Sequence, residues 1–217
     1  KEAERWREAL AKVGAELVGL DHNPIDRLWS DQPGDPFSAI RAQPLAYAGE
    51  DSAAKRTRLG AEIARRGAKA AVLNQLDSIA WILNVRGGDT PSTPLVQSFL
   101  ILASDGHATW FVDKAKFTPG LAAHLGNGVT VRPLEALLEG LQDLAGQAVT
   151  IEPETATAWI EDVLKARGAT IIHGPDPAVL PKACKNPVEL AGTRKAHLRD
   201  GAAMVRFLHW IDREAAG

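Results

Sequence analysis

Short apolar runs of strand character alternate with helix-like segments through the middle of this chain, and this alternation constrains the fold more than any other feature. The strand-like runs are residues 70–73, 95–103, 108–112, 129–131, 148–151 and 170–172. The helix-like segments are 53–66, 78–83, a short helix near 121, 134–144 and 155–166. This order is typical of a sheet that is covered by helices.

One pair of neighbouring runs has a different connection. Residues 95–103 and 108–112 are joined by Ser104-Asp105-Gly106-His107, and an Asp-Gly step between two strands is a hairpin signal. These two strands should therefore pair antiparallel. With the helix-linked strands around them, they predict an α/β fold with a mixed β-sheet and helices on its faces.

The two ends of the chain predict flanking pieces. Residues 2–13 have helical spacing and 16–20 are strand-like, which indicates a helix-strand remnant. Residues 23–44 hold four of the thirteen prolines and predict a linker. Pro187 opens a long amphipathic helix that we expect to run to Glu214. Its apolar positions are Leu198, Ala202, Val205, Leu208 and Ile211. We expect domain boundaries at 1–46, 47–178 and 179–217.

Composition limits the partners and the compartment. The chain has 217 residues, 45% of them hydrophobic, and a formal net charge of -2, so we expect no nucleic-acid partner. Its apolar runs are far shorter than the roughly 20 residues that span a bilayer, so we expect no membrane partner. A single cysteine, Cys184, excludes an intrachain disulfide. Since the N-terminus has no signal-peptide pattern, a cytoplasmic location is expected.

The segment 76–89 is the strongest candidate for a functional site. It joins an apolar helical turn that carries Trp81 to the polar exit Arg86-Gly87-Gly88-Asp89. The glycines allow a sharp turn and a close approach to a neighbour. Two interpretations remain open. Trp81, Arg86 and Asp89 line a site, or Trp81 packs in the core while Arg86 pairs with Asp89 to fix a turn.

No other set of residues predicts catalysis or metal binding. Ser78 lacks a nucleophile elbow, and Cys184 has no histidine nearby in the sequence. His107, His124 and His173 lack metal-ligand spacing. We therefore expect no catalytic residue, metal ligand or cofactor site in this chain.

Three separated segments resemble one family. Residues 76–89 resemble the "LDDIAWLLNIRGSD" segment of three-domain Xaa-Pro aminopeptidases, also called aminopeptidase P. Residues 23–36 resemble the linker "NLVDxIWxDRPxxP" of the same enzymes. Residues 180–208 resemble the opening of their catalytic domain, which has the pita-bread fold. The chain departs from the family at Gly88, where serine is common, and at 91–94, where a "YNP" triplet is common.

This resemblance implies a function and a place in a larger protein. The family releases an N-terminal residue that precedes proline, using two divalent ions, manganese or zinc, held by carboxylates and a histidine of the catalytic domain. The chain would contain the end of the first domain, the creatinase/prolidase-like middle domain and the start of the catalytic domain. We expect it to be inactive by itself, to shape substrate access and oligomerisation, and to form a homodimer through the helix that begins at Pro187. Trp81, Arg86 and Asp89 would have a substrate-access or inter-domain role, with the fork of Arg86 binding a substrate or inter-domain carboxylate. The alternative is a stand-alone creatinase-type N-terminal domain that binds a partner without peptidase activity.

Overall fold

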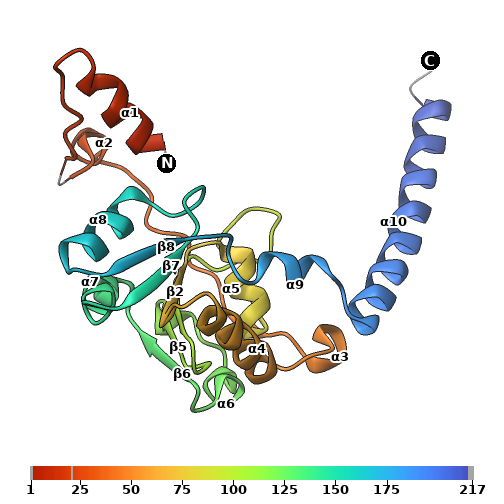
Figure 1. The fold of residues 1–217 in the computed structure, drawn as a ribbon. Coiled ribbons are helices and arrows are strands. Elements are labelled where there is room, and N and C mark those ends of the chain that lie inside the picture. Colours follow the sequence, from red (N-terminus) through yellow and green to blue (C-terminus); the bar gives the residue numbers. More distant parts are fainter. Residues whose placement is uncertain (1, 21, 215–217) are drawn as a thin grey trace.

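A six-stranded mixed sheet forms the centre of the computed structural model, which describes residues 2–20 and 22–214 (Figure 1). The strands are β2 (Ala70–Leu73), β4 (Phe99–Ala103), β5 (Ala108–Phe111), β6 (Val129–Arg132), β7 (Ala148–Ile151) and β8 (Thr170–His173). Their spatial order is β6-β5-β4-β2-β7-β8. Strand β4 is antiparallel to both neighbours, and the other adjacent strands run parallel. The mixed α/β fold is confirmed.

Helices cover both faces of this sheet because successive strand residues point to opposite sides. On β2, Ala71 and Leu73 belong to one core and Ala70 and Val72 to the other. The first core is closed by α4 (Ser52–Arg65), α5 (Leu76–Leu83) and α6 (Leu121–Leu125). The second is closed by α7 (Leu137–Gln142) and α8 (Ala158–Ala166). Each face of the sheet is therefore buried under helices.

The predicted hairpin is present, although its first strand is shorter than expected. Strands β4 and β5 pair antiparallel, with Leu102 opposite Ala108, and Gly106 in the turn has a φ of 87°. The strand begins at Phe99 and not at residue 95, because the backbone of residues 94–97 bonds to the 87–89 loop. Those hydrogen-bonding groups are unavailable to a sheet ladder.

The second half of the proline-rich segment packs on the central unit. Helix α2 (Pro24–Leu28) interrupts the first half, and its residues are exposed. Further along, Ile40 is 0% exposed, and its backbone bonds to Lys116 and Thr118. Strand β1 (Arg41–Ala42) then pairs antiparallel with β3 (Val85–Arg86). Residues 40–42 therefore belong to the same packed body as the sheet.

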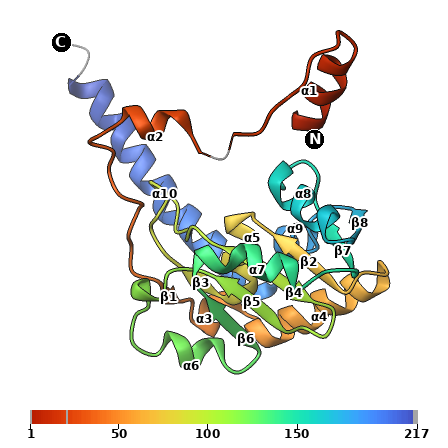
Figure 2. The ribbon, with the colours of Figure 1, turned by 90° about the vertical axis from the view of Figure 1, so that its left-hand side faces the viewer.

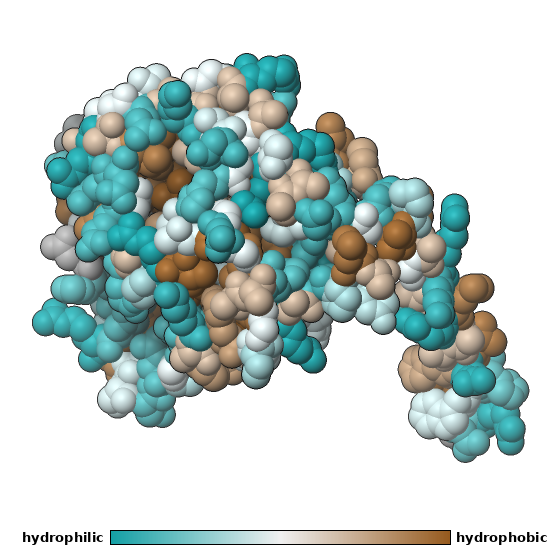
Figure 3. Space-filling model, turned by 90° about the horizontal axis from the view of Figure 1, so that it is seen from below, coloured by the Kyte–Doolittle hydropathy of each residue, from teal (hydrophilic) through white to brown (hydrophobic). Residues whose placement is uncertain are grey.

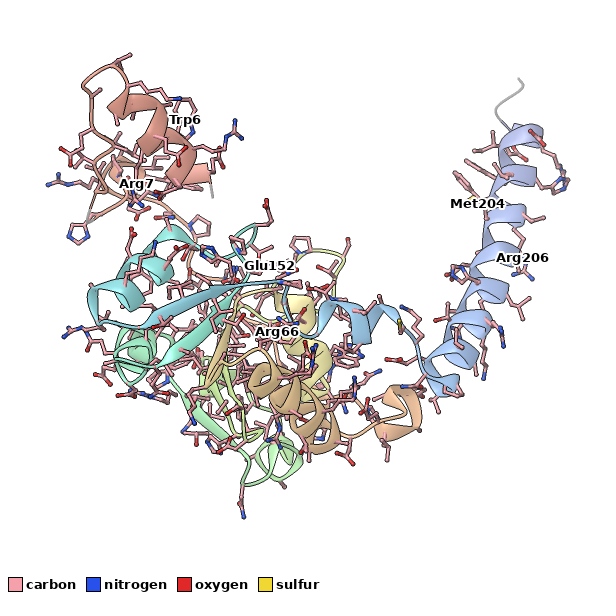
Figure 4. All side chains as sticks on the ribbon, viewed as in Figure 1. Trp6, Arg7, Arg66, Glu152, Met204 and Arg206 are labelled. Carbon is pink, nitrogen blue, oxygen red and sulfur yellow. The ribbon has the colours of Figure 1, made fainter. Side chains whose placement is uncertain are left out.

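The predicted N-terminal helix is confirmed as α1 (Glu2–Ala11), but the strand expected at 16–20 was a wrong prediction. Those residues are exposed and have no neighbouring strand among the residues described, and a strand gains its hydrogen bonds only from a neighbour. Arg7 of α1, which is labelled in Figure 4, forms an ion pair of 2.8 Å with Asp162 of α8. This pair connects α1 to the central unit.

The C-terminal helix is confirmed with the expected bounds, as α10 (Pro187–Glu214). Its first turns lie against α3 (Leu45–Ala48), and α9 (Val179–Ala183) leads into it. Figures 1 and 2 show the rest of α10 projecting from the body, and none of its described residues is buried. Two short 3-10 helices, η1 (Lys114–Lys116) and η2 (Leu134–Ala136), complete the elements. Within the described ranges, no helix has the length and apolar character needed to cross a membrane.

Candidate functional site

A buried lysine connects the beginning of α4 to the end of α5. Asp51 caps α4 by accepting a hydrogen bond from the Ala54 backbone N–H (2.7 Å), and Lys55 follows in the first turn. Lys55 is 0% exposed, and its Nζ donates to the carbonyl oxygen of Trp81 (3.0 Å) and to Asn84 Oδ1 (2.7 Å). The same Nζ lies 4.1 Å from the centre of the Trp81 ring. A cation therefore lies against the aromatic face of the predicted site residue.

Asn84 makes this arrangement possible through its backbone conformation. It ends α5 in the left-handed region, with a φ of 51°, which asparagine tolerates better than most residues. Its Oδ1 accepts from Lys55 while its Nδ2 donates to the Glu50 carbonyl oxygen (2.8 Å). Asn84 thus connects the chain before α4 with the end of α5.

The electrostatic state of Lys55 depends on its burial and on nearby carboxylates. Burial lowers the pKa of Lys55 from 10.5 to about 8, because the charged ammonium loses hydration. Glu189 and Glu50 oppose this shift, and the positive charges of Arg86 and Arg58 add to it. Lys55 therefore titrates near neutral pH, within the field of a carboxylate on α10.

The carboxylate of Glu189 joins α10 to Trp81. The Trp81 Nε1–H donates to Glu189 Oε1 (3.1 Å), and the Asn186 backbone N–H donates to Glu189 Oε2 (2.9 Å). In return, the Glu189 N–H donates to Asn186 Oδ1 (3.0 Å), which is the reciprocal pattern of a capping box. Asn186 Nδ2 also donates to the Ala48 carbonyl oxygen (2.8 Å). The start of α10 is therefore fixed to both α5 and α3.

Arg86 lies beside this junction on β3. Its Nη1 donates to the carbonyl oxygens of Ala80 (3.0 Å) and Val85 (2.8 Å). Burial lowers the pKa of Arg86, and the negative charge of Glu189 opposes that shift. Gly87 follows in close contact with its neighbours, because a Cβ there would lie 2.5 Å from Val96 Cγ2. The predicted close approach of the backbone at this glycine is confirmed.

Asp89 belongs to a different, buried ionic cluster. Its Oδ2 accepts from Lys116 Nζ (2.8 Å) and the Gln97 N–H (2.9 Å), and its Oδ1 accepts from the Ser38 hydroxyl (2.7 Å) and N–H (3.1 Å). Burial by itself would raise the pKa of Asp89, but these hydrogen bonds and the charge of Lys116 lower it overall. The alternative in which Arg86 pairs with Asp89 was therefore wrong, because Asp89 has Lys116 as its ion partner.

A hollow of about 700 Å³ opens between the central unit and the start of α10. Trp81 and Arg86 both line it, whereas Asp89 does not. The Trp81 side chain is only 7% exposed and belongs to the first hydrophobic core. It therefore packs in the core and also forms part of the wall of the hollow. Lys55, Asn84 and Glu189 line the hollow too and were not among the predicted site residues.

The sequence contains local signals for Glu189 and Lys55. Asn186-Pro187-Val188-Glu189 has the spacing of a capping box, with proline at the first helical position. Lys55 precedes Leu59 and Ile63 at intervals of four, which places it on the buried side of its helix. The contact between Trp81 and Glu189 spans 108 positions in the chain and has no local signal.

The described residues do not fit the two divalent ions that the resemblance implies. In residues 2–20 and 22–214 no three His, Cys, Asp or Glu side chains come together as a group that could hold a metal ion. Cys184 is a free, exposed thiol. We therefore derive no chemical step through a metal in this chain.

Comparison with known proteins shows the family. A model of the Creatinase/Prolidase N-terminal domain matches residues 31–189, and this chain belongs to that family. Among its relatives, a probable Xaa-Pro aminopeptidase P of Aspergillus niger is 33% identical over 216 residues, covering 95% of this chain and 35% of the relative. Aminopeptidase P2 of Arabidopsis thaliana is 35% identical over 244 residues, covering 98% of this chain and 34% of the relative.

A solved structure agrees with these relatives. The X-prolyl aminopeptidase of Caenorhabditis elegans, described as a cytosolic enzyme with a di-nuclear active site, superposes with a TM-score of 0.89 at 26% identity. The match covers 98% of this chain and 35% of the worm enzyme. The chain thus spans about a third of the length of these relatives.

Proposed function

We propose that this chain is the non-catalytic portion of a metal-dependent Xaa-Pro aminopeptidase that releases the N-terminal residue preceding proline. The identities of 33% and 35% with two aminopeptidases P and the TM-score of 0.89 with the worm enzyme support this assignment. The substrates would be peptides with proline at the second position. Two divalent ions, manganese or zinc, would be held outside the residues described above.

The observation that carries the role of this portion is the hydrogen bond from Trp81 to Glu189. It fixes the beginning of α10 against α5, with the Asn186 amide on α3 as a second attachment. Residues that follow α10 in a longer protein would inherit this orientation. The segment 81–86 would therefore shape access to substrate by holding the two parts together, and Asp89 would act indirectly by supporting the loop.

We also propose the organisation and setting of the whole protein. The chain would comprise the end of a first domain, a middle domain and the start of a catalytic domain at 179–217, with residues 36–46 assigned to the middle domain because Ile40 lies in its core. The exposed apolar side of α10 suits self-association into a homodimer. The description of the worm enzyme as cytosolic supports a cytoplasmic location.

The test is hydrolysis of an Xaa-Pro peptide by the full-length natural protein. Trp81→Phe keeps an aromatic side chain but replaces the indole and its Nε1–H donor, so we expect kcat/KM to fall about tenfold, the effect of one lost hydrogen bond to a charged group. Trp159→Phe on α8, where the side chain is exposed, is the matched control. Equal activity of the two variants would contradict the access role. Absence of hydrolysis in the full-length protein would favour the stand-alone binding module.

A further inference from the structure

The hollow beside α10 has an unequal distribution of charge. Four cationic side chains line it, and the only carboxylate among its described lining residues is Glu189. The cations are Lys55, Arg86, Lys185 and Lys195. Both oxygens of Glu189 already accept hydrogen bonds, from Trp81 and from Asn186. One engaged carboxylate cannot balance four positive charges, so the hollow favours an anion.

The donors at the wall suit a group with two oxygens. Arg86 uses Nη1 for two backbone carbonyls, and its Nε and Nη2 have no hydrogen-bond acceptor among the residues that the structure describes. A guanidinium edge of this kind binds a carboxylate through two parallel hydrogen bonds. Lys55 is 0% exposed and its Nζ is held by the Trp81 carbonyl oxygen and Asn84, so it adds positive charge behind this wall but no donor to a ligand.

Apolar surface surrounds these donors. Trp81, Tyr47, Pro187 and Val188 line the hollow together with the small side chains Ala46 and Ala48. A volume of about 700 Å³ lies within the range of sites that hold small organic molecules. A ligand that fills this space would therefore need an apolar body as well as an anionic group, which bare phosphate or chloride does not have.

We propose that the hollow binds an organic carboxylate with an apolar body, of the kind that the carboxyl end of a short peptide presents. The carboxylate pairs with the free edge of Arg86 in the positive field of the nearby lysines, and the apolar part packs on Trp81 and Pro187. The choice of a peptide rests on the proposed function, since peptides are the substrate class of that enzyme. The charge and shape of the hollow do not depend on it.

The 217-residue chain is titrated with the dipeptide Ala-Pro, and the indole N–H signals are followed by NMR up to about 10 mM ligand, which covers a dissociation constant of about 1 mM. Three further probes are Ala-Pro amide, 3-phenylpropanoate and inorganic phosphate. We expect Ala-Pro to shift the Trp81 signal and the amide and phosphate to bind at least tenfold more weakly. Equal binding of the amide overturns the carboxylate assignment. Equal binding of phosphate overturns the need for an apolar body.

The variants separate the site from general charge effects. Arg86→Gln should weaken Ala-Pro binding about tenfold, because it removes the charged fork. Arg41→Gln is the matched control, since Arg41 is exposed and pairs with Arg86 across β1 and β3. Lys195→Gln alters an exposed lining residue that folding does not require, and it should weaken binding several-fold. Unchanged affinity in both Arg86→Gln and Lys195→Gln overturns the proposal.

The remaining outcomes distinguish this proposal from the proposed function. Binding of 3-phenylpropanoate without binding of Ala-Pro overturns the peptide assignment, while peptidase activity is decided by hydrolysis in the full-length protein. No shift with any carboxylate overturns the site itself. Binding is measured on the 217-residue chain, for which no hydrolysis is expected. A failure of binding is therefore distinct from a failure of hydrolysis in the full-length protein.

Discussion

At the scale of single residues, Lys55 offers a direct measure of how closely Glu189 is held. Burial lowers the pKa of Lys55 to about 8, and the Glu189 charge raises it. Glu189→Gln should therefore lower the Lys55 pKa further, as measured by NMR titration of the lysine side chain. Glu62→Gln changes a carboxylate two turns further along α4 that is ion-paired with Arg65 and Arg66, and it should leave the Lys55 pKa unchanged. An unaltered pKa in Glu189→Gln would mean that α10 does not begin beside Lys55 in solution.

The same shift predicts a pH dependence of stability. The folded pKa of about 8 lies below the ordinary value of 10.5, so between these values the unfolded chain binds more protons than the folded chain. The Lys55 contribution to the free energy of unfolding should therefore increase as pH rises from about 8 to 10.5. Urea unfolding of the chain and of Lys55→Gln across this interval isolates that contribution.

Among the single substitutions, one that breaks the buried pair of Asp89 and Lys116 should cause the largest loss in the free energy of unfolding. Asp89→Asn leaves the Lys116 charge buried without its partner, so we expect a loss of about 3–5 kcal/mol in the free energy of unfolding, measured with urea. Asp143→Asn breaks an exposed pair with Arg132 and should cost about 1 kcal/mol or less. Similar losses in both variants would contradict the assignment.

At acid pH, the free energies of unfolding of Asp89→Asn and of the unmodified chain should become more similar. The folded pKa of Asp89 lies below its ordinary value of 3.8. Its contribution is therefore complete above pH 3.8 and is lost as the pH falls through the folded pKa. An unfolding series at decreasing pH, with the two chains compared at each point, measures this convergence.

At the scale of elements, α10 carries an apolar surface without a partner in the described structure. Leu198 is 77% exposed, and Val205 and Leu208 are exposed on the same helix. Figure 3 shows hydrophobic residues along this projecting arm, and Figure 4 shows Met204 and Arg206 on it away from the other elements. In a full-length aminopeptidase P, we expect this surface to lie against the catalytic sheet.

The isolated chain should therefore associate through α10. Burial of each large aliphatic side chain is worth roughly 1.5–3 kcal/mol, which favours contact with a second copy. Sedimentation should show a dimer or larger species for the unmodified chain and a monomer for Leu198→Glu with Leu208→Glu. Arg199→Glu with Arg206→Glu adds as many carboxylates without removing apolar surface and should still associate. A monomeric unmodified chain would contradict this prediction.

Local periodicity predicted the elements that depend on nearby residues. The strand at Ala70–Leu73 and the helix at Pro187–Glu214 have the expected bounds, since four apolar residues and a proline start with helical spacing are local signals. Pairing with a distant strand has no local signal. The strand expected at 16–20 is absent because it has no such neighbour in the described structure, whereas the pairing of β1 with β3 is present but was not predicted. At the site, Trp81 and Arg86 followed from their segment, but the contact of Glu189 with Trp81 required the tertiary structure.

At the scale of the whole molecule, the position of Ile40 determines where the folding unit begins. Residues 2–39 contribute no buried side chain among those described, whereas Ile40 is 0% exposed and Ser38 binds Asp89. The family match likewise begins at residue 31. A boundary at residue 47 would remove Ile40, β1 and the Ser38 contacts from the core that they complete.

Truncation tests this boundary. Residues 31–189 should unfold within about 1 kcal/mol of the 217-residue chain, because none of the removed residues that the structure describes is buried. Residues 47–189 should unfold in one transition but lose about 3 kcal/mol or more, since deleting a buried isoleucine side chain costs 2–5 kcal/mol and Asp89 also loses two donors. Urea unfolding measures both. If residues 31–189 and 47–189 were equally stable, residues 36–42 would not contribute to the stability of the core. The middle domain would then begin near residue 47.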